Sequence, residues 1–145
     1  MRIHIQRVKE AFVVVSGREV GRIGAGLVLL AAARKGDSQA TLPKLAEKCL
    51  NLRIFSDPDG KMNLSVRDVK GSLLVISNFT LYGDCRKGNR PNFMDAAPGP
   101  EAEKLYNRFV ELLKAGSVPV ATGVFGAMMD VHLVNDGPVT VLVEG

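Results

Sequence analysis

The sequence has few of the side chains on which hydrolytic and metal sites are usually built. Its 145 residues include only two histidines and two cysteines, and no tryptophan. A hydrolase triad needs a base within reach of its nucleophile, but His4 and His132 both lie in predicted strands with apolar neighbours, where a packing role is commoner. Because no CxxC or HExxH spacing occurs either, we expect no metal site and no cofactor.

Long apolar runs and a disulfide framework are also missing. The longest apolar run, 24–33, is far too short to cross a bilayer, so we expect no membrane insertion. A pair as sparse as Cys49 and Cys85, with no signal peptide, is typical of reduced thiols in a cytoplasmic protein. The net charge of +4 permits an anionic partner, although the positive charge is less dense than in a dedicated nucleic-acid tail.

The strand pattern is clear in the first part of the chain. At 46% hydrophobic residues, the chain can bury a core, and we expect one domain spanning 1–145. Alternating apolar residues predict an N-terminal strand, a short strand, a turn at Ser16 and Gly17, another short strand, and a buried strand from about Leu27. The glycines of GRIGAG, 21–26, lie between strands and so indicate turns and close backbone packing, not a phosphate loop.

Two segments have helical periodicity. The first is capped by Asp37 or Ser38, has Pro43 in its first turn and ends near 51–53. The second begins at Pro100 and ends at Gly116, and its inward stripe comprises Ala102, Leu105, Tyr106, Phe109, Leu112 and Leu113. Because these helices do not strictly alternate with the strands, the sequence predicts an α+β fold with mostly antiparallel sheet.

The stretch LLVISNFTLYG, 73–83, begins as an apolar strand and becomes polar on both faces at once. Alternate residues of a strand point to opposite faces, so Ser77 and Phe79 share one face while Asn78 and Thr80 share the other. One interpretation is a buried strand that reaches solvent, where polar side chains bond to a turn. The other is a functional site built at the end of the strand.

The stretch NDGPVT, 135–140, also has two interpretations. It fits an Asp-Gly hairpin turn in which Pro138 opens the next strand, and 118–145 then forms two or three strands. Alternatively, a rigid fold holds Gly137-Pro138 cis, since an X-Pro bond disfavours that form by only about 0.5–1 kcal/mol. The carbonyls of Gly137 and Pro138 then point in one direction and could hold an ammonium group.

Together, SNFTL and NDGPVT resemble the paired signatures SQFTL and NxGPxT of the D-aminoacyl-tRNA deacylases. The likeness is collinear and runs nearly end to end, through IQRV at 5–8, RIFSDPDGKMNLSV at 53–66, KGNRPNF at 87–93 and TGVFGAMMDVHLVNDGPVT at 122–140. The resemblance implies a homodimer of layered, barrel-like β/β/α subunits. It also implies hydrolysis of the ester that joins a D-amino acid to the terminal adenosine of tRNA, a chiral proofreading step in translation, with glycyl-tRNA as a further candidate substrate.

The resemblance also assigns roles to particular residues. In the family, the Gly-Pro dipeptide, here Gly137 and Pro138, is inserted in cis into the pocket of the other subunit. An arginine that matches Arg7 supports this dipeptide, and Asn135 opens the same motif, so we expect all four residues to bind substrate.

The family's SQFTL segment lines the reacting carbonyl, and this implies catalytic roles for Ser77, Asn78, Phe79 and Thr80. Backbone N-H groups near Phe79 and Thr80 supply the oxyanion site. Asn78 replaces the family's Gln and is shorter by one methylene, so a hydrogen bond made at full reach is lost or bridged by water.

No side-chain base is available to activate Thr80, so we assign it a positioning role, and the family mechanism recruits the 2′-hydroxyl of the terminal ribose instead. One alternative is the related deacylase type, whose Gly-Pro is trans, which tolerates some L-amino acids and which carries Ala at the position of Phe79. Another is a nucleic-acid-binding module without catalysis, for which CRKGNR, 85–90, is the best basic stretch.

Overall fold

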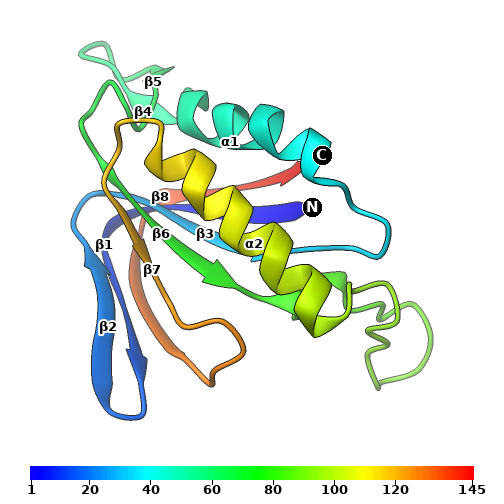
Figure 1. The fold of residues 1–145 in the computed structure, drawn as a ribbon. Helices are drawn as coiled ribbons and strands as arrows, with labels where there is room; N and C mark the ends of the chain where they lie inside the picture. The colour runs from blue at the N-terminus through cyan, green and yellow to red at the C-terminus, as the bar shows by residue number, and fades with distance from the viewer.

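The computed structural model describes residues 1–145 and contains one mixed six-stranded sheet (Figure 1). The strand order is β2-β1-β3-β6-β7, with β8 on the other edge of β1. The strands are β1 (Arg2–Val15), β2 (Arg18–Ile23), β3 (Gly26–Ala32), β6 (Ser72–Ser77), β7 (Val120–Thr122) and β8 (Asp130–Glu144), with a separate pair β4 (Phe55–Ser56) and β5 (Met62–Leu64). Helical segments are η1 (Gln39–Thr41), α1 (Leu42–Asn51), η2 (Phe79–Tyr82) and α2 (Gly99–Lys114).

The predicted α+β class is confirmed, and the ladders show how the sheet is built. Strand β1 pairs antiparallel with β2, β3 and β8, whereas β3-β6 and β6-β7 are parallel pairs. The predicted N-terminal strand and the short strand after it are one continuous β1. The turn at Ser16 and Gly17 is confirmed: both residues have positive φ, 49° and 75°, as a two-residue hairpin of this hand requires.

Helices α1 and α2 cover one face of the sheet (Figure 1). Between them and the sheet lies the larger apolar cluster, which includes Phe109, Leu50 and Ile5. A smaller cluster lies among β1, β2, β3 and β6 and includes Val13, Ile23 and Leu74. The sheet is therefore covered on one side and curled around a second core on the other, as a barrel-like layered fold requires.

The glycines of GRIGAG allow the strands to approach closely. A Cβ atom on Gly21 would lie 2.6 Å from the carbonyl oxygen of Thr122, and one on Gly26 would overlap the backbone of Ser72. Gly21 thus lets β2 approach β7, which nearly closes the sheet. Close backbone packing, the interpretation favoured from the sequence, explains this segment.

Both predicted helices are present. Pro43 lies in the first turn of α1, which ends at Asn51, and α2 begins next to Pro100 and ends before Gly116. Ser38 caps the short turn η1, not α1, because its side-chain oxygen accepts from the Ala40 amide at 3.2 Å. None of the helices is long and apolar enough to span a membrane.

The segment that contains Gly137-Pro138 is a bulge within β8, so the hairpin interpretation was wrong. Asn135 pairs with Val8 and Thr140 pairs with Gln6, so four residues of β8 lie opposite the single residue Arg7. The ladder resumes beyond the bulge because β1 is long enough to pair with β8 on both sides of it.

Candidate active site

The polar end of β6 lies where the chain leaves the sheet. Ser77 is the last residue of β6 and pairs with Ala31 of β3. The backbone N-H of Asn78 donates to the Ala31 carbonyl at 2.8 Å. The Asn78 backbone, with φ −148° and ψ 85°, then turns the chain into η2. The four predicted residues Ser77–Thr80 therefore form one strand-to-turn corner.

The start of η2 presents backbone N-H donors. Phe79 and Thr80 are its first two residues, and the first N-H groups of a helical turn have no acceptor within the turn. Asn78 does not cap them with its side chain. Its Oδ1 instead accepts from Thr80 Oγ1 at 2.5 Å. This corner can thus stabilise a negatively charged oxygen through the backbone.

A small cavity of about 60 Å³ adjoins this corner. Its lining combines the strand end with residues of β3, α2 and the loop after β7: Met1, Ala31, Ala32, Ala33, Ser77, Asn78, Phe79, Ala102, Tyr106 and Phe125. Phe79 is 57% exposed, and its ring packs edge-to-face with that of Phe93 at 5.3 Å between ring centres. An exposed aromatic ring next to uncapped amides offers an apolar surface to a ligand.

Tyr106 and Phe125 were not identified as site residues from the sequence. The Tyr106 hydroxyl donates to the Val75 carbonyl at 2.9 Å, which links α2 to β6 close to the corner. Burial raises the pKa of Tyr106 to about 12, so the hydroxyl stays a neutral donor. Helical periodicity indicates only that Tyr106 faces inward, and no local pattern distinguishes a cavity wall from the core.

Arg7 anchors the bulge of β8. Its Nη1 donates to the Ile54 carbonyl at 2.6 Å, and its Nε lies 3.2 Å from both the carbonyl and the carboxylate oxygen of Asp136. The Arg7 side chain is 11% exposed, and its guanidinium lies over the Phe55 ring at 5.9 Å. Arg7 therefore holds the residue that directly precedes Gly137.

The Gly137-Pro138 bond is cis, and both residues are exposed. Gly137 has φ +120°, and a Cβ atom there would lie 2.9 Å from Arg7 Nη2. Only glycine fits this backbone next to the arginine. The dipeptide thus projects outward from a supported base.

Asn135 is held by a side-chain network of the same bulge. Gln6 Oε1 accepts from Asn135 Nδ2 at 2.8 Å and from Thr140 Oγ1 at 2.7 Å. The side-chain oxygen of Asn135, Oδ1, is buried without a hydrogen-bond partner within the chain. Asn135 therefore stabilises the bulge and keeps one free acceptor beside it.

The two groups of predicted residues do not meet within one chain. Ser77 lies level with Ala31 and Ile3 along the sheet, whereas the bulge lies level with Arg7, about 13 Å further along β1. Strand β8 is also three strands away from β6, or about 14 Å across the sheet. The chain thus carries an uncapped corner and, separately, an exposed dipeptide.

Comparisons with known proteins agree with this pair of motifs. Residues 4–144 match the family described as D-Tyr-tRNA(Tyr) deacylase. The chain belongs to this family. It is 56% identical over 144 residues to a D-aminoacyl-tRNA deacylase of Syntrophobacter fumaroxidans, covering 99% of this chain and 97% of that one. It is 57% identical over 144 residues to one of Bacillus cytotoxicus, covering 99% of each chain.

Two solved structures are also similar. The c-Myc DNA unwinding element binding protein superposes with a TM-score of 0.94 at 41% identity, covering 100% of this chain and 99% of that one. A probable eukaryotic D-amino acid tRNA deacylase has a TM-score of 0.83 at 18% identity, covering 98% and 97% of the two chains, and supports the fold alone.

Proposed function

We propose that this chain hydrolyses the ester bond of D-aminoacyl-tRNA, releasing the D-amino acid and free tRNA. The observation that carries the proposal is the corner at Ser77–Thr80, where uncapped backbone amides begin η2 beside a small cavity. Family membership and relatives of 56–57% identity with this activity in their names support the same reaction.

The reaction needs little help from side chains. An aminoacyl ester is already activated, so orienting it and stabilising the oxyanion that develops on its carbonyl is sufficient. The amides of Phe79 and Thr80 supply this stabilisation, and one well-placed donor contributes on the order of 10² to 10³ in rate. Water attacks the ester carbonyl with assistance from the 2′-hydroxyl of the terminal ribose instead of a protein nucleophile, the ester oxygen leaves as a ribose hydroxyl of the free tRNA, and no metal ion takes part.

Thr80 positions the corner and does not attack the ester. Its hydroxyl donates to the amide oxygen of Asn78, which is not a base and does not take up the proton. The same bond gives the shorter Asn78 a structural role at the position where the family carries Gln. Ser77 and Asn78 thus line the reacting group, and the backbone of the next two residues acts on it.

We infer that the complete site forms between two copies of the chain. Gly137-Pro138 of one subunit enters the cavity beside Phe79 of the other, which unites the two groups that a single chain keeps apart. Exposure of the dipeptide supports this arrangement. So does the unpaired outer edge of β8, because free strand edges readily pair with another chain.

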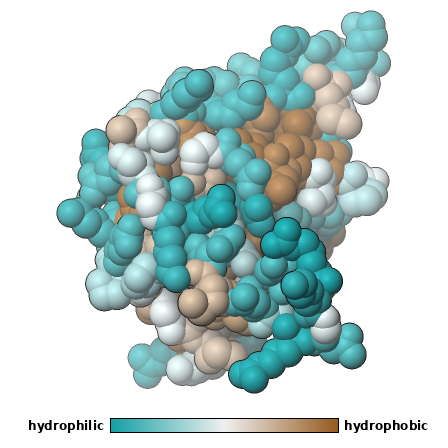
Figure 2. Space-filling view, turned by 90° about the vertical axis from the view of Figure 1, so that its right-hand side faces the viewer, coloured by the Kyte–Doolittle hydropathy of each residue, from teal (hydrophilic) through white to brown (hydrophobic).

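The surface supports the same inference. Figure 2 shows hydrophobic residues gathered in one area among hydrophilic residues, on the face that lies to the right in Figure 1. Strand β8 itself exposes Val131, Val134 and Leu142. Exposed apolar areas of this kind often form interfaces.

Selection of the D configuration follows from this geometry. Backbone carbonyls of the inserted dipeptide hold the ammonium group and crowd the alpha carbon, so an L side chain meets main-chain atoms while a D side chain points out. Selectivity arises from rejection, and the enzyme accepts several D-amino acids. Glycine has no side chain to reject, so glycyl-tRNA is a substrate as well.

The acceptor end of tRNA reaches the site past an exposed basic loop. Arg86, Lys87 and Arg90 are exposed, and the loop contacts the corner through Phe93 and Phe79. Phosphates attract such side chains at long range. This partner is met in the cytoplasm, where the whole chain acts as one domain in translation quality control.

The test compares the release of tyrosine from D-Tyr-tRNA and L-Tyr-tRNA in the presence of a chelator. The expected result is rapid hydrolysis of the D ester and no acceleration for the L ester. Comparable rates for both esters would contradict the D-specific assignment, although the cis Gly137-Pro138 bond already distinguishes this chain from the type with a trans Gly-Pro. Binding of nucleic acid without hydrolysis would support the second candidate, a nucleic-acid-binding module; the 41% identical relative is described as binding a DNA unwinding element.

A further inference from the structure

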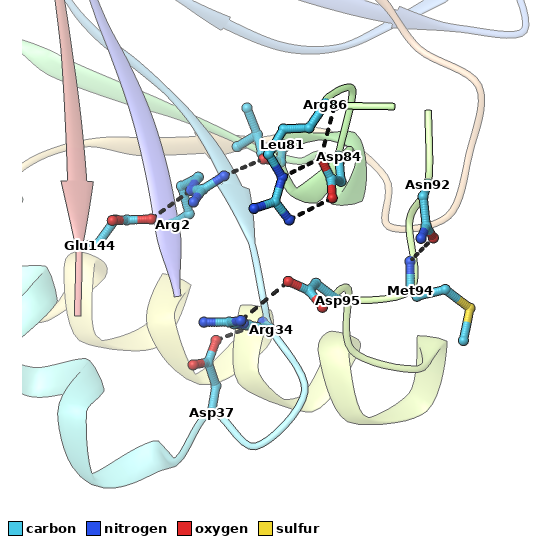
Figure 3. A network of polar contacts seen from close by, with 10 residues as sticks. All are labelled: Arg2, Arg34, Asp37, Leu81, Asp84, Arg86, Asn92, Met94, Asp95 and Glu144. Carbon is cyan, nitrogen blue, oxygen red and sulfur yellow. Dashed lines mark hydrogen bonds and ion pairs between the residues drawn. The ribbon is translucent and has the colours of Figure 1, made fainter. Parts of the chain in front are cut away.

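Arg2 joins the start of β1 to the turn that carries the proposed oxyanion donors. Its Nη1 donates to the Leu81 carbonyl at 2.7 Å, and its guanidinium lies 4.7 Å from the centre of the Tyr82 ring. Its Nε donates to Glu144 Oε1 at 2.6 Å. Figure 3 shows Arg2 between Glu144 on β8 and Leu81 in η2.

The turn η2 is short and needs support from outside. It has four residues, and its bond from the Leu81 amide to the Asn78 carbonyl is long, at 3.3 Å. The last carbonyls of a helical turn lack partners within it, and Leu81 is the penultimate residue. Arg2 satisfies this carbonyl, so it fixes the end of η2 opposite to the uncapped amides.

Glu144 determines how Arg2 is oriented. The two residues are cross-strand partners in the β1-β8 ladder, so their backbones are fixed relative to one another. With Nε engaged by the carboxylate, the planar guanidinium presents Nη1 to Leu81. Strand β8, which carries Gly137-Pro138, is thereby linked to the turn that carries Phe79.

Other ion pairs in the same region do not reach η2. Arg34 pairs with Asp95, and Arg86 pairs with Asp84, both with exposed arginine side chains (Figure 3). Exposed pairs of this kind contribute little to stability. Arg2 differs because it bonds to the backbone of the turn itself.

We propose that Arg2, oriented by Glu144, is a positioning residue that holds η2 in the geometry required for oxyanion stabilisation. It does not touch the substrate, and it acts through the backbone of Leu81 on the amides at the start of the turn. The proposal rests on the proposed function, since the corner must be the reacting site.

The test measures kcat and KM for D-Tyr-tRNA hydrolysis by the wild type and by Arg2→Met, Arg2→Lys and Glu144→Gln. Arg2→Met removes both polar bonds and is expected to lower kcat by about tenfold to a hundredfold, with KM within about twofold. Arg2→Lys keeps the positive charge but lacks the planar, multidentate guanidinium. It is expected to recover part of the kcat that Arg2→Met loses. Glu144→Gln keeps an acceptor oxygen and is expected to have the smallest effect.

Arg108→Gln is the matched control. It removes an exposed ion pair between Arg108 and Glu111 on α2, and its kcat is expected to equal that of the wild type. Thermal unfolding followed by circular dichroism gives the folded fraction at the assay temperature. If Arg2→Met does not fold, the kcat values of Arg2→Lys and Glu144→Gln are compared. A lower kcat in Arg2→Lys supports the positioning role, and equal values overturn it.

An unchanged kcat in the Arg2 variants, a rise in KM alone, or an equal loss in Arg108→Gln would overturn the positioning role. So would a loss of kcat that matches the unfolded fraction. Failure of the proposed function looks different, because the wild type itself would then not hydrolyse D-Tyr-tRNA.

Discussion

Replacing Phe79 by proline tests the oxyanion assignment at a single atom. Phe79 is the first residue of η2, a position where proline's fixed φ is compatible with a helical turn and where only the N-H is lost. The preceding residue, Asn78, has φ −148° and ψ 85°, outside the helical region that a following proline disfavours. Phe79→Pro therefore deletes the donor with little cost to the backbone.

Phe79→Ala is the matched control, because it removes the same ring and keeps the amide. Phe79 is 57% exposed and its ring has one aromatic neighbour, so loss of the ring costs about 1 kcal/mol of stability or less. One oxyanion donor is worth about 2.7 to 4 kcal/mol, so Phe79→Pro should be 10² to 10³-fold slower than Phe79→Ala at a saturating concentration of D-Tyr-tRNA. Single-turnover release of D-tyrosine measures the ratio, and equal rates in two folded variants would refute the assignment.

Three further predictions concern other parts of the structure. Thr80→Ala should keep kcat within about tenfold of the wild type, since the hydroxyl only orients the corner; an acyl-enzyme trapped on Thr80 would contradict this. Arg7→Met should lower the free energy of unfolding in urea by about 2 to 4 kcal/mol and weaken hydrolysis, because the Ile54 and Asp136 carbonyls lose a charged donor; unchanged stability and activity would show that the anchor is unimportant. Burial raises the pKa of the Cys49 thiol to about 12, so above about pH 9 the unfolded chain loses this proton first and the free energy of unfolding should fall by about 1.4 kcal/mol per pH unit. The slope should be shallower by that amount in Cys49→Ala, and an equal slope would disprove the cause.

The sequence pattern predicts the helices and the polar corner well because both depend on neighbouring residues. Pro43 and Pro100 define the first turns of α1 and α2 whatever packs against them. The simultaneous change to polar residues at Ser77 and Asn78 likewise identifies the end of β6. These features are encoded within about one turn or strand of the chain.

Features set by distant partners were not predicted from the pattern. Asp136-Gly137 is a strong local turn signal, yet pairing of β8 with β1 on both sides converts it into a bulge. The bond from Arg2 to Leu81 joins residues 79 apart in the chain. Tyr106 likewise meets Val75 only through the packing of α2 on the sheet.

The central claim, a site shared between two subunits, is tested most directly by mixing defective subunits. One variant is Phe79→Pro, which lacks the donor, and the other is Gly137→Ala, which places an alanine at φ +120°, a backbone conformation that L side chains rarely adopt, and so displaces the dipeptide. In a heterodimer with two-fold symmetry, one site carries both defects and the other carries neither. Co-expression with random pairing should therefore restore about a quarter of the wild-type D-Tyr-tRNA hydrolysis. If heterodimers are present by native mass spectrometry and the activity does not exceed that of the separate variants, the shared site is contradicted.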